Sequence, residues 1–125
     1  MRVLHTDRAP AAIGPYSQAV EAGGFLFTAG QIGLIPGTPD LAGGDVESQA
    51  VQVFRNLAAI LEEADMAFAD VVKTTVYLAD MGEFPLVNAI YESYFAQPYP
   101  ARSTVAAAGL PKGARVEIDV VARRP

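Results

Sequence analysis

The sequence predicts one α+β domain in two layers, with an antiparallel or mixed sheet that carries both helices on one face. Two observations predict this class. The 125 residues match the size of a single domain with one shared core. Strand and helix patterns follow one another in the order ββαβαββ, without an internal repeat or a low-complexity segment. We therefore expect one domain over residues 1–125.

A hairpin and a loop follow the N-terminal segment. Residues 17–32 read SQAVEAGGFLFTAGQI, in which two β-prone runs flank the dipeptide Gly23-Gly24. Two successive glycines tolerate the positive φ angles of a tight turn, so this segment predicts a β-hairpin. The next segment, GLIPGTPDLAGG, is rich in glycine and proline and predicts a loop.

An amphipathic helix is predicted from Asp45 to Ala64. Apolar residues recur there at steps of three and four, while polar residues, Asn56 among them, take the other faces. Asp45 suits the N-cap position, because its carboxylate can accept a backbone N–H and faces the positive end of the helix dipole.

A strand and a second helix come next. Residues 70–80, DVVKTTVYLAD, alternate at period two and are rich in β-branched side chains, which predicts a strand. Asp80 then predicts a helix start, with Glu83 three residues later in the position that a capping box uses. The buried face of this helix is predicted to carry Leu86, Ile90 and Tyr94. Asn88 is expected to point away from this buried face.

The C-terminal segment predicts two further strands. Pro98 and Pro100 stiffen the chain and end the helix, and the runs ARSTVAA and ARVEIDVVA follow them. A GLPKG turn joins the two runs, so the sequence predicts a second hairpin.

Charge and composition exclude several kinds of function. The net charge of −5 gives a surface that repels a polyanion, so nucleic acid is not an expected partner. The chain has no cysteine and a single histidine, His5, so it can form neither a thiolate zinc site nor a histidine cluster. We expect no metal and no cofactor.

The hydrophobic content of the chain is high, yet it predicts no membrane segment. Residues 22–39 carry no charge, but glycines and prolines interrupt them, so they predict strands and turns. Residues 1–17 contain no apolar run of the kind found in secretion signals, and we expect a cytoplasmic protein. Hydrophobic residues make up 51% of so small a chain, which favours apolar surface buried between subunits.

Two charged residues lie within apolar strand patterns. Arg102 occupies the start of one predicted strand. Its guanidinium can bind a carboxylate through two hydrogen bonds, or it can simply be exposed to solvent at the strand end. Glu117 shares a strand face with Arg115 and Asp119. This pattern fits a solvent-facing side, and it also fits a carboxylate that orients or deprotonates water. The residues alone leave both alternatives open.

Motifs of common nucleophile and phosphate sites are absent. The chain contains no GxSxG, Walker loop, HExxH or Rossmann GxGxxG. The AGQIG run is too short and wrongly placed for a dinucleotide loop, so it predicts only strand-end glycines. Tyr16 and Asn88 can line a pocket or merely pack, and nothing local decides between these roles.

Several motifs in order identify a family. They are IGPYSQAV, FTAGQIG, VKTTVYLAD, VNAIYESYF and PARSTV with LPKGARVEIDVVA. With them, residues 13–122 resemble the Rid family, the reactive intermediate deaminases also called the YjgF type. The resemblance implies a fold similar to trimeric chorismate mutase, with a six-stranded sheet and two helices, assembled as a homotrimer. It also implies pockets between subunits that hydrolyse enamines and imines such as 2-aminoacrylate, released by pyridoxal-phosphate enzymes, to 2-keto acids and ammonia.

The resemblance also implies roles for individual residues. Arg102 matches the carboxylate-binding arginine of the family, and Glu117 matches the glutamate that positions water. The substrate-binding positions match Tyr16, Gly30, Asn88, Arg102 and Thr104. Two departures bear on the expected substrate range: Ala29 replaces a frequent serine, and Thr104 has a hydroxyl where many members have a thiol.

This residue set fits the implied chemistry. An iminium carbon is already electrophilic, so water attacks it without a metal or a strong nucleophile, and the enzyme has chiefly to supply position. A carboxylate at Glu117 can also favour the iminium electrostatically. Two alternatives stay open: a non-catalytic protein that binds or senses small carboxylates such as 2-keto acids, and a chaperone or translation-inhibitor type of the same family.

Overall fold

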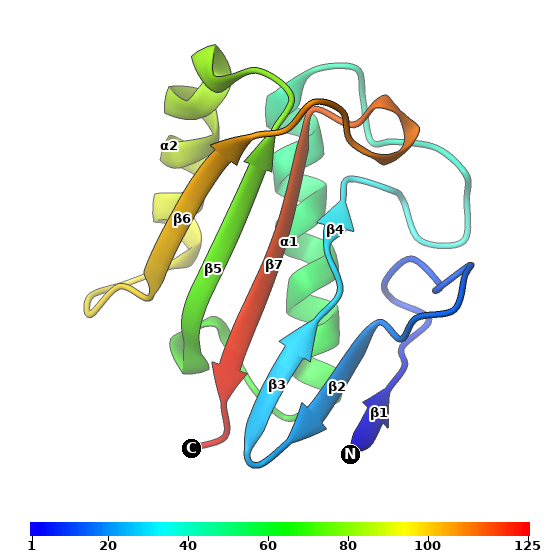
Figure 1. The fold of residues 1–125 in the computed structure, drawn as a ribbon, viewed down its shortest axis with the longest axis vertical. Helices are drawn as coiled ribbons and strands as arrows, with labels where there is room; N and C mark the ends of the chain where they lie inside the picture. The colour runs from blue at the N-terminus through cyan, green and yellow to red at the C-terminus, as the bar shows by residue number, and fades with distance from the viewer.

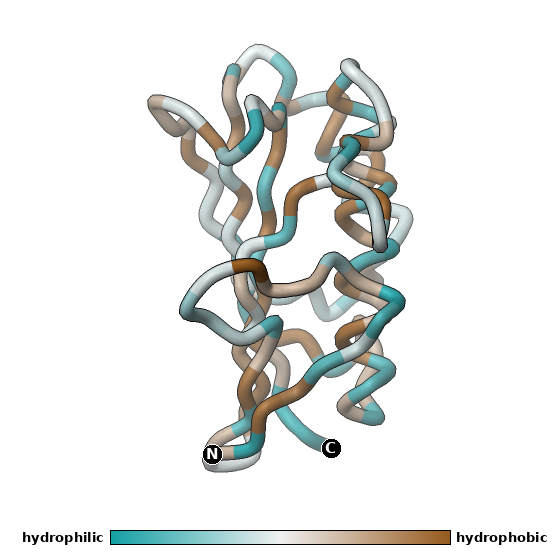
Figure 2. Tube along the Cα trace, turned by 90° about the vertical axis from the view of Figure 1, so that its right-hand side faces the viewer, coloured by the Kyte–Doolittle hydropathy of each residue, from teal (hydrophilic) through white to brown (hydrophobic).

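The computed structural model describes all 125 residues and stacks one sheet against two helices in two layers (Figures 1 and 2). The strands are β1 (Arg2–Leu4), β2 (Ala19–Ala22), β3 (Phe25–Thr28), β4 (Gln31–Ile32), β5 (Val71–Leu78), β6 (Ala101–Ala106) and β7 (Val116–Arg123). The helices are α1 (Val46–Glu63) and α2 (Phe84–Tyr94), with 3-10 turns η1 (Phe68–Asp70), η2 (Met81–Glu83) and η3 (Pro111–Gly113).

The sheet is mixed, as predicted, and both helices cover the same face of it (Figure 1). It has seven strands where the resemblance implies six, since the short β4 adds to the six strands of the main order. The strand order is β1-β2-β3-β7-β5-β6, and β4 pairs with β7 beyond the end of β3. Only β5 and β6 are parallel, whereas every other pair is antiparallel. The N-terminal strand β1 was not predicted from the strand pattern. The α+β class and the two-layer arrangement are confirmed.

The predicted C-terminal hairpin is wrong, because β5 lies between β6 and β7. The chain leaves β5, passes through α2 and returns as a parallel neighbour, which is the usual result of a helical crossover. The connection from β6 to β7 then crosses the end of β5. There the N–H of Ala107 donates to the carbonyl of Leu78 at 2.8 Å, and the N–H of Ala79 donates to the carbonyl of Arg115 at 3.0 Å.

The hydrophobic core fills the space between the sheet and the helices. Strand β7 contributes its alternate residues Val116, Ile118, Val120 and Ala122, all buried. Phe54 of α1 is fully buried at the centre and stacks on Tyr94 with ring centroids 4.5 Å apart. The opposite face of the sheet is not covered by this chain, and Phe27 on that face remains 45% exposed.

Two local predictions hold at the first hairpin and the first helix. Gly23 and Gly24 adopt φ angles of 60° and 83° in the turn between β2 and β3. Asp45 caps α1, because its carboxylate accepts the backbone N–H of Ser48 at 2.9 Å. Neither helix has the length and apolar character required to cross a membrane.

The second helix differs from its prediction in its start and its buried face. Asp80 caps the turn η2 through the N–H of Gly82 at 2.9 Å, and α2 itself begins at Phe84. Glu83 forms no capping box, because its carboxylate binds the guanidinium of Arg115. The buried residues of α2 are Val87 and Tyr91. Of the residues predicted to be buried, Leu86 is 45% exposed, while Ile90 and Tyr94 are half-buried.

Candidate active site

A cavity of about 740 Å³ opens where three connecting segments meet at one end of the sheet. These segments are residues 10–18, residues 29–39 and the connection before β7, which lie side by side in Figure 1. Its lining includes Ile13, Tyr16, Gly30, Leu34, Lys112 and Glu117. The lining is largely apolar, with one carboxylate and one ammonium group, which is a composition suited to a small organic ligand.

Glu117 reaches this cavity because Gly30 gives it room. A Cβ atom at Gly30 would lie 2.8 Å from Cδ of Glu117, closer than side chains pack. The register of β7 shifts by one residue between its pairing of Val121 with Phe27 and its pairing of Ile118 with Gln31. Such an irregularity turns a strand locally. The glycine predicted to be a simple strand end therefore shapes the site of the carboxylate.

The environment of Glu117 raises its pKa above the ordinary value. Burial is the main cause, and the negative charge of Asp119 on the same strand face adds to it. Burial also raises the pKa of Asp119, although a hydrogen bond from the hydroxyl of Tyr77 at 3.2 Å opposes this effect. A half-buried carboxylate of this kind is a stronger base than an exposed one and can exchange protons nearer neutrality.

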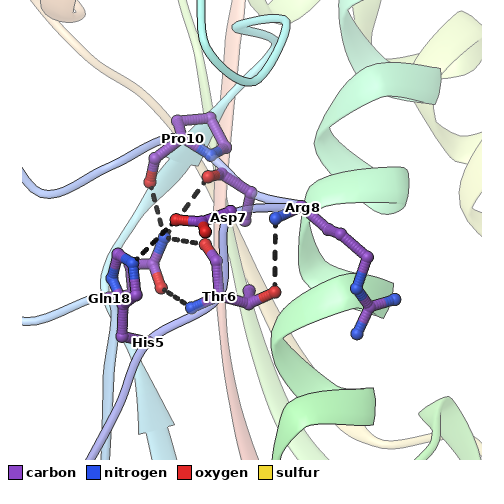
Figure 3. Close-up of polar contacts among 7 residues, drawn as sticks. His5, Thr6, Asp7, Arg8, Pro10 and Gln18 are labelled. Atoms are coloured by element: carbon purple, nitrogen blue, oxygen red, sulfur yellow. Dashed lines mark hydrogen bonds and ion pairs between the residues drawn. The ribbon is translucent and has the colours of Figure 1, made fainter.

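Gln18 fixes the N-terminal wall of the cavity (Figure 3). Its Oε1 accepts the N–H of Thr6 at 2.7 Å, and its Nε2 donates to the carbonyls of Thr6 at 3.0 Å and Pro10 at 2.8 Å. The side chain is 2% exposed, and these bonds satisfy it. Figure 3 also shows His5 beside Asp7, with Nε2 of His5 3.1 Å from Oδ1 of Asp7, and both side chains are exposed.

Asn56 fixes the second wall, contrary to its predicted place on an outer face of the helix. It is fully buried, and its Nδ2 donates to the carbonyls of Ile32 at 3.3 Å and Leu34 at 2.9 Å. Helical periodicity counts polar residues as outward, but a loop packed against the helix supplies carbonyl acceptors that the pattern does not show. Asn56 therefore joins α1 to the cavity loop.

A second group of polar residues surrounds Arg102 on the edge strand β6. Its Nη1 donates to Oδ1 of Asn88 at 2.8 Å. The Cζ of Arg102 lies 5.2 Å from the ring centroid of Phe84 and 4.7 Å from that of Tyr91, both on α2. Arg102 itself is exposed, and its hydrogen bond to Asn88 leaves its other N–H donors without a partner in this chain.

Arg102 and Glu117 lie on opposite faces of the sheet. Arg102 pairs in register with Thr74, whose side chain points to the helices, whereas Glu117 pairs with Tyr77, which lies on the uncovered face. Strand β5 separates them, and each belongs to its own cluster. One chain therefore does not bring the two residues predicted to be catalytic into a single site.

The other predicted residues divide in the same way. With Glu117, on the side of the cavity, are Tyr16, Ala29 and Gly30. With Arg102, beside α2, are Asn88 and Thr104, the latter half-buried on the same face of β6. Asn88 is half-buried and points toward Arg102, on the same side of α2 as the buried Tyr91.

Sequence reasoning missed three residues of these clusters. Lys112 lines the cavity in a left-handed conformation, with φ of 58°, and only the LPKG motif draws attention to it. Phe84 and Tyr91 support Arg102, but aromatic residues in a helix pattern are ordinarily assigned to the core. No group of three or more histidine, cysteine, aspartate or glutamate side chains is placed to hold a metal ion.

This architecture and its paired clusters define a small α+β protein of the YjgF-like structural class. E. coli TdcF, solved with bound serine, matches it with a TM-score of 0.94 and 39% identity, over 100% of both chains. The chain belongs to the endoribonuclease L-PSP family, whose model matches residues 6–124. This confirms the resemblance to the YjgF type.

Two relatives illustrate the range of names within the family. A RutC family protein of Synechocystis is 55% identical over 127 residues, covering 100% of this chain and 98% of the relative. The human 2-iminobutanoate/2-iminopropanoate deaminase is 48% identical over 121 residues, covering 97% of this chain and 88% of the relative.

Proposed function

We propose that this protein hydrolyses reactive 2-enamine and 2-imine acids, such as 2-aminoacrylate, to 2-keto acids and ammonia. The proposal rests above all on one observation. Glu117, whose pKa is raised, lines a cavity, and Arg102 lies on the edge strand β6, where Asn88 accepts one of its hydrogen bonds. These are the two groups that imine hydrolysis requires, one for water and one for the substrate carboxylate.

The active unit in this proposal is a homotrimer with sites between its subunits. Since Arg102 and Glu117 lie on opposite faces of one sheet, a site that uses both needs two copies of the chain. Apolar side chains on the uncovered face supply a surface for such contact. They include Val3, 58% exposed, Phe27, 45% exposed, and Val105, 44% exposed. The proposed location is the cytoplasm.

Arg102 binds the substrate carboxylate in this mechanism. Asn88 occupies only one N–H of the guanidinium, so the fork keeps donors for two parallel hydrogen bonds to a carboxylate. Binding at this point fixes the position of the adjacent imine carbon. The entropy of bringing the reactants together is then lost on binding rather than in the reaction step.

Glu117 of the neighbouring copy activates water. The enamine first takes a proton from the solvent at its terminal carbon and becomes the iminium. Ionised Glu117 removes a proton from water, whose oxygen forms a bond to the imine carbon while the C=N π electrons move to nitrogen. Protonated Glu117 returns this proton to the nitrogen of the carbinolamine. The carbinolamine then loses its hydroxyl proton to the ionised Glu117 and expels ammonia, which leaves the 2-keto acid. The raised pKa of Glu117 suits both the acceptance and the return of the proton.

Two relatives support this assignment. The human relative at 48% identity is named a 2-iminobutanoate/2-iminopropanoate deaminase. The E. coli relative was solved with serine, a three-carbon amino acid that carries a carboxylate like the proposed substrates.

Ribonuclease activity fits the chain less well. Its net charge is −5, and its one histidine, His5, lies on the surface beside Asp7. Phosphodiester binding calls for a basic surface, and general acid–base cleavage calls for paired titrating groups. Nucleic acid is therefore not part of the proposal.

A second candidate is a binding protein for small carboxylates without catalysis. The cluster around Arg102 favours it, because that cluster can bind a carboxylate without the help of Glu117. The two candidate functions differ in their need for Glu117: hydrolysis requires this residue, whereas carboxylate binding does not.

The test couples the protein to an enzyme that releases 2-aminoacrylate and follows decay of the imine against formation of pyruvate. The proposal expects the wild type to accelerate both, and the Glu117→Gln variant to lose the acceleration while it still binds 2-ketobutyrate in calorimetry. Binding of 2-ketobutyrate without any acceleration by the wild type would favour the binding protein. Acceleration retained by Glu117→Gln would exclude the assigned role of Glu117.

A further inference from the structure

One face of α2 is built around the guanidinium of Arg102. Phe84, Asn88 and Tyr91 lie four and then three residues apart, so they share one stripe of the helix. Two of them place aromatic rings near Cζ of Arg102, at 5.2 and 4.7 Å, and the third accepts a hydrogen bond from Nη1 at 2.8 Å. An exposed arginine is thus restrained by three partners.

Tyr91 is the most firmly fixed of these partners. Its side chain is 4% exposed, and its hydroxyl lies 2.9 Å from Oγ1 of Thr74, which is fully buried on β5, the strand next to β6. Thr74 is also the residue that pairs with Arg102 between β5 and β6. Arg102, Thr74 and Tyr91 therefore form a closed set, joined by strand pairing, a hydrogen bond and a ring contact.

The rest of the tyrosine ring is held by the core. Its centroid lies 4.5 Å from that of Phe95 and 6.0 Å from that of Phe54. A ring fixed by the core and by a buried hydroxyl partner is a rigid support for a cation on its face. An arginine on an edge strand would otherwise sample many rotamers, and ordering it would weaken carboxylate binding.

We propose that Tyr91 is a positioning residue, which holds the guanidinium of Arg102 in the orientation that receives the substrate carboxylate. The ring performs this task. Its packing against Phe95 and Phe54 holds it, and the hydrogen bond to Thr74 adds a further restraint. The inference rests on the proposed function for its substrate, but the contact itself can be tested in the absence of any reaction. It assigns a role to a buried aromatic residue that the predicted buried face of this helix did not include.

The kinetic experiment compares three variants with the wild type. Tyr91→Leu removes the ring, Tyr91→Phe keeps the ring and removes the hydroxyl, and Tyr94→Leu removes another tyrosine ring of α2, which packs on Phe54 and does not contact Arg102. We expect Tyr91→Leu to raise KM for 2-aminoacrylate about tenfold with kcat changed less than about threefold, since the ring acts on binding. Tyr91→Phe and Tyr94→Leu should stay within about threefold of the wild-type KM.

A spectroscopic experiment tests the contact without catalysis. The Nε–H signal of Arg102, identified by its loss in Arg102→Lys, should be shifted upfield by the rings in the wild type. This shift should persist in Tyr91→Phe and diminish in Tyr91→Leu, together with affinity for 2-ketobutyrate. Absence of the shift in the wild type would overturn the proposal, even if Tyr91→Leu fails to fold.

The role of Tyr91 and the proposed reaction are tested separately by these measurements. A folded Tyr91→Leu variant with the wild-type KM and 2-ketobutyrate affinity overturns the role of Tyr91, and imine hydrolysis still stands. A KM increase in Tyr94→Leu equal to that in Tyr91→Leu also overturns it, because the effect would then follow core packing. A third outcome is that the wild type shows the shifted signal and Tyr91→Leu loses affinity for 2-ketobutyrate, but the wild type hydrolyses no imine. This outcome supports the positioning role of Tyr91 and contradicts the proposed reaction.

Discussion

Arg102 and Glu117 lie on opposite faces of the same sheet, with strand β5 between them. Strand pairing and alternation fix this separation, so no side-chain rotation within one chain can bring the two groups together. Each is nevertheless prepared for a ligand, one by Asn88 and two rings, the other by the space at Gly30.

Replacement of Arg102 should reduce activity without loss of the fold. Arg102→Ala removes a charged hydrogen-bonding partner, with a loss of about 2 to 4 kcal/mol in transition-state stabilisation, or roughly 30- to 1,000-fold in kcat/KM. Arg102→Lys keeps the charge but loses the planar fork, so it should also fall, though less far. Steady-state kinetics with coupled 2-aminoacrylate release measures both. Arg55→Ala, which removes an exposed arginine of α1, is the control.

Mixing two inactive variants should restore activity. In a trimer assembled from equal amounts of Arg102→Ala and Glu117→Gln, about a quarter of the intersubunit sites combine an intact Glu117 with an intact Arg102 of the neighbour. The measurement is the rate after the variants are unfolded and refolded together, against each refolded alone. A mixture no more active than its components would place both residues in the same chain's site.

A methyl group at Gly30 should displace the carboxylate of Glu117. The added Cβ would lie 2.8 Å from Cδ and 3.1 Å from Cγ of that side chain. We expect Gly30→Ala to lower kcat/KM on the order of 100-fold, since displacing a catalytic group by an ångström has effects of that size. At Gly44 a Cβ meets nothing within 4 Å, so Gly44→Ala is the matched control. Equal activity of the two variants would show that the carboxylate position does not matter.

The activity should depend on the charge of Asp119 through pH. Burial and then the charge of Asp119 raise the pKa of Glu117, so the acidic limb of kcat/KM should lie above the ordinary carboxyl value of 4.5. Asp119→Asn removes the second cause, so the pKa of Glu117 falls and the limb moves to lower pH. The pH–rate profile measures this shift, with the exposed Glu92→Gln as control. A limb shifted to higher pH would contradict the electrostatic argument.

The same pKa shifts affect stability with a defined sign. Between the ordinary and the raised pKa values, the folded protein binds more protons at Glu117 and Asp119 than the unfolded chain. Their contribution to stability is therefore complete below the ordinary values and is lost as pH rises through the raised ones. Thermal melts should show Asp119→Asn gaining stability relative to the wild type as pH increases over that window.

The uncovered sheet face should mediate assembly. Sedimentation equilibrium should give three times the chain mass of 13.2 kDa for the wild type. Phe27→Glu places a charge on that face and should dissociate the assembly and abolish activity together, because the proposed site uses two copies of the chain. Leu86→Glu is the matched control, since both parent residues are 45% exposed, but Leu86 belongs to α2. Active monomers of Phe27→Glu would remove the need for an intersubunit site.

Much of the fold could be predicted from local pattern. The turn at Gly23 and Gly24, the cap at Asp45, and the period of β5 each follow from a few neighbouring residues, and the structure confirms them. The prediction of a C-terminal hairpin was wrong for a different reason. A strand pattern gives the face of each residue but not the neighbouring strand, and β5 took the place between β6 and β7.

The amino-acid sequence by itself determined which groups are available and which strand face each one occupies. It identified Arg102, Glu117, Tyr16, Gly30 and Asn88 as candidates, and its motifs identified the family. The tertiary structure decided how they group. It joined Arg102 to Asn88 and to the ring of Tyr91, and placed Glu117 against Gly30 on the other face. These contacts link residues distant in the chain, and they arise from helix packing and strand order, which hydrophobic periodicity does not encode.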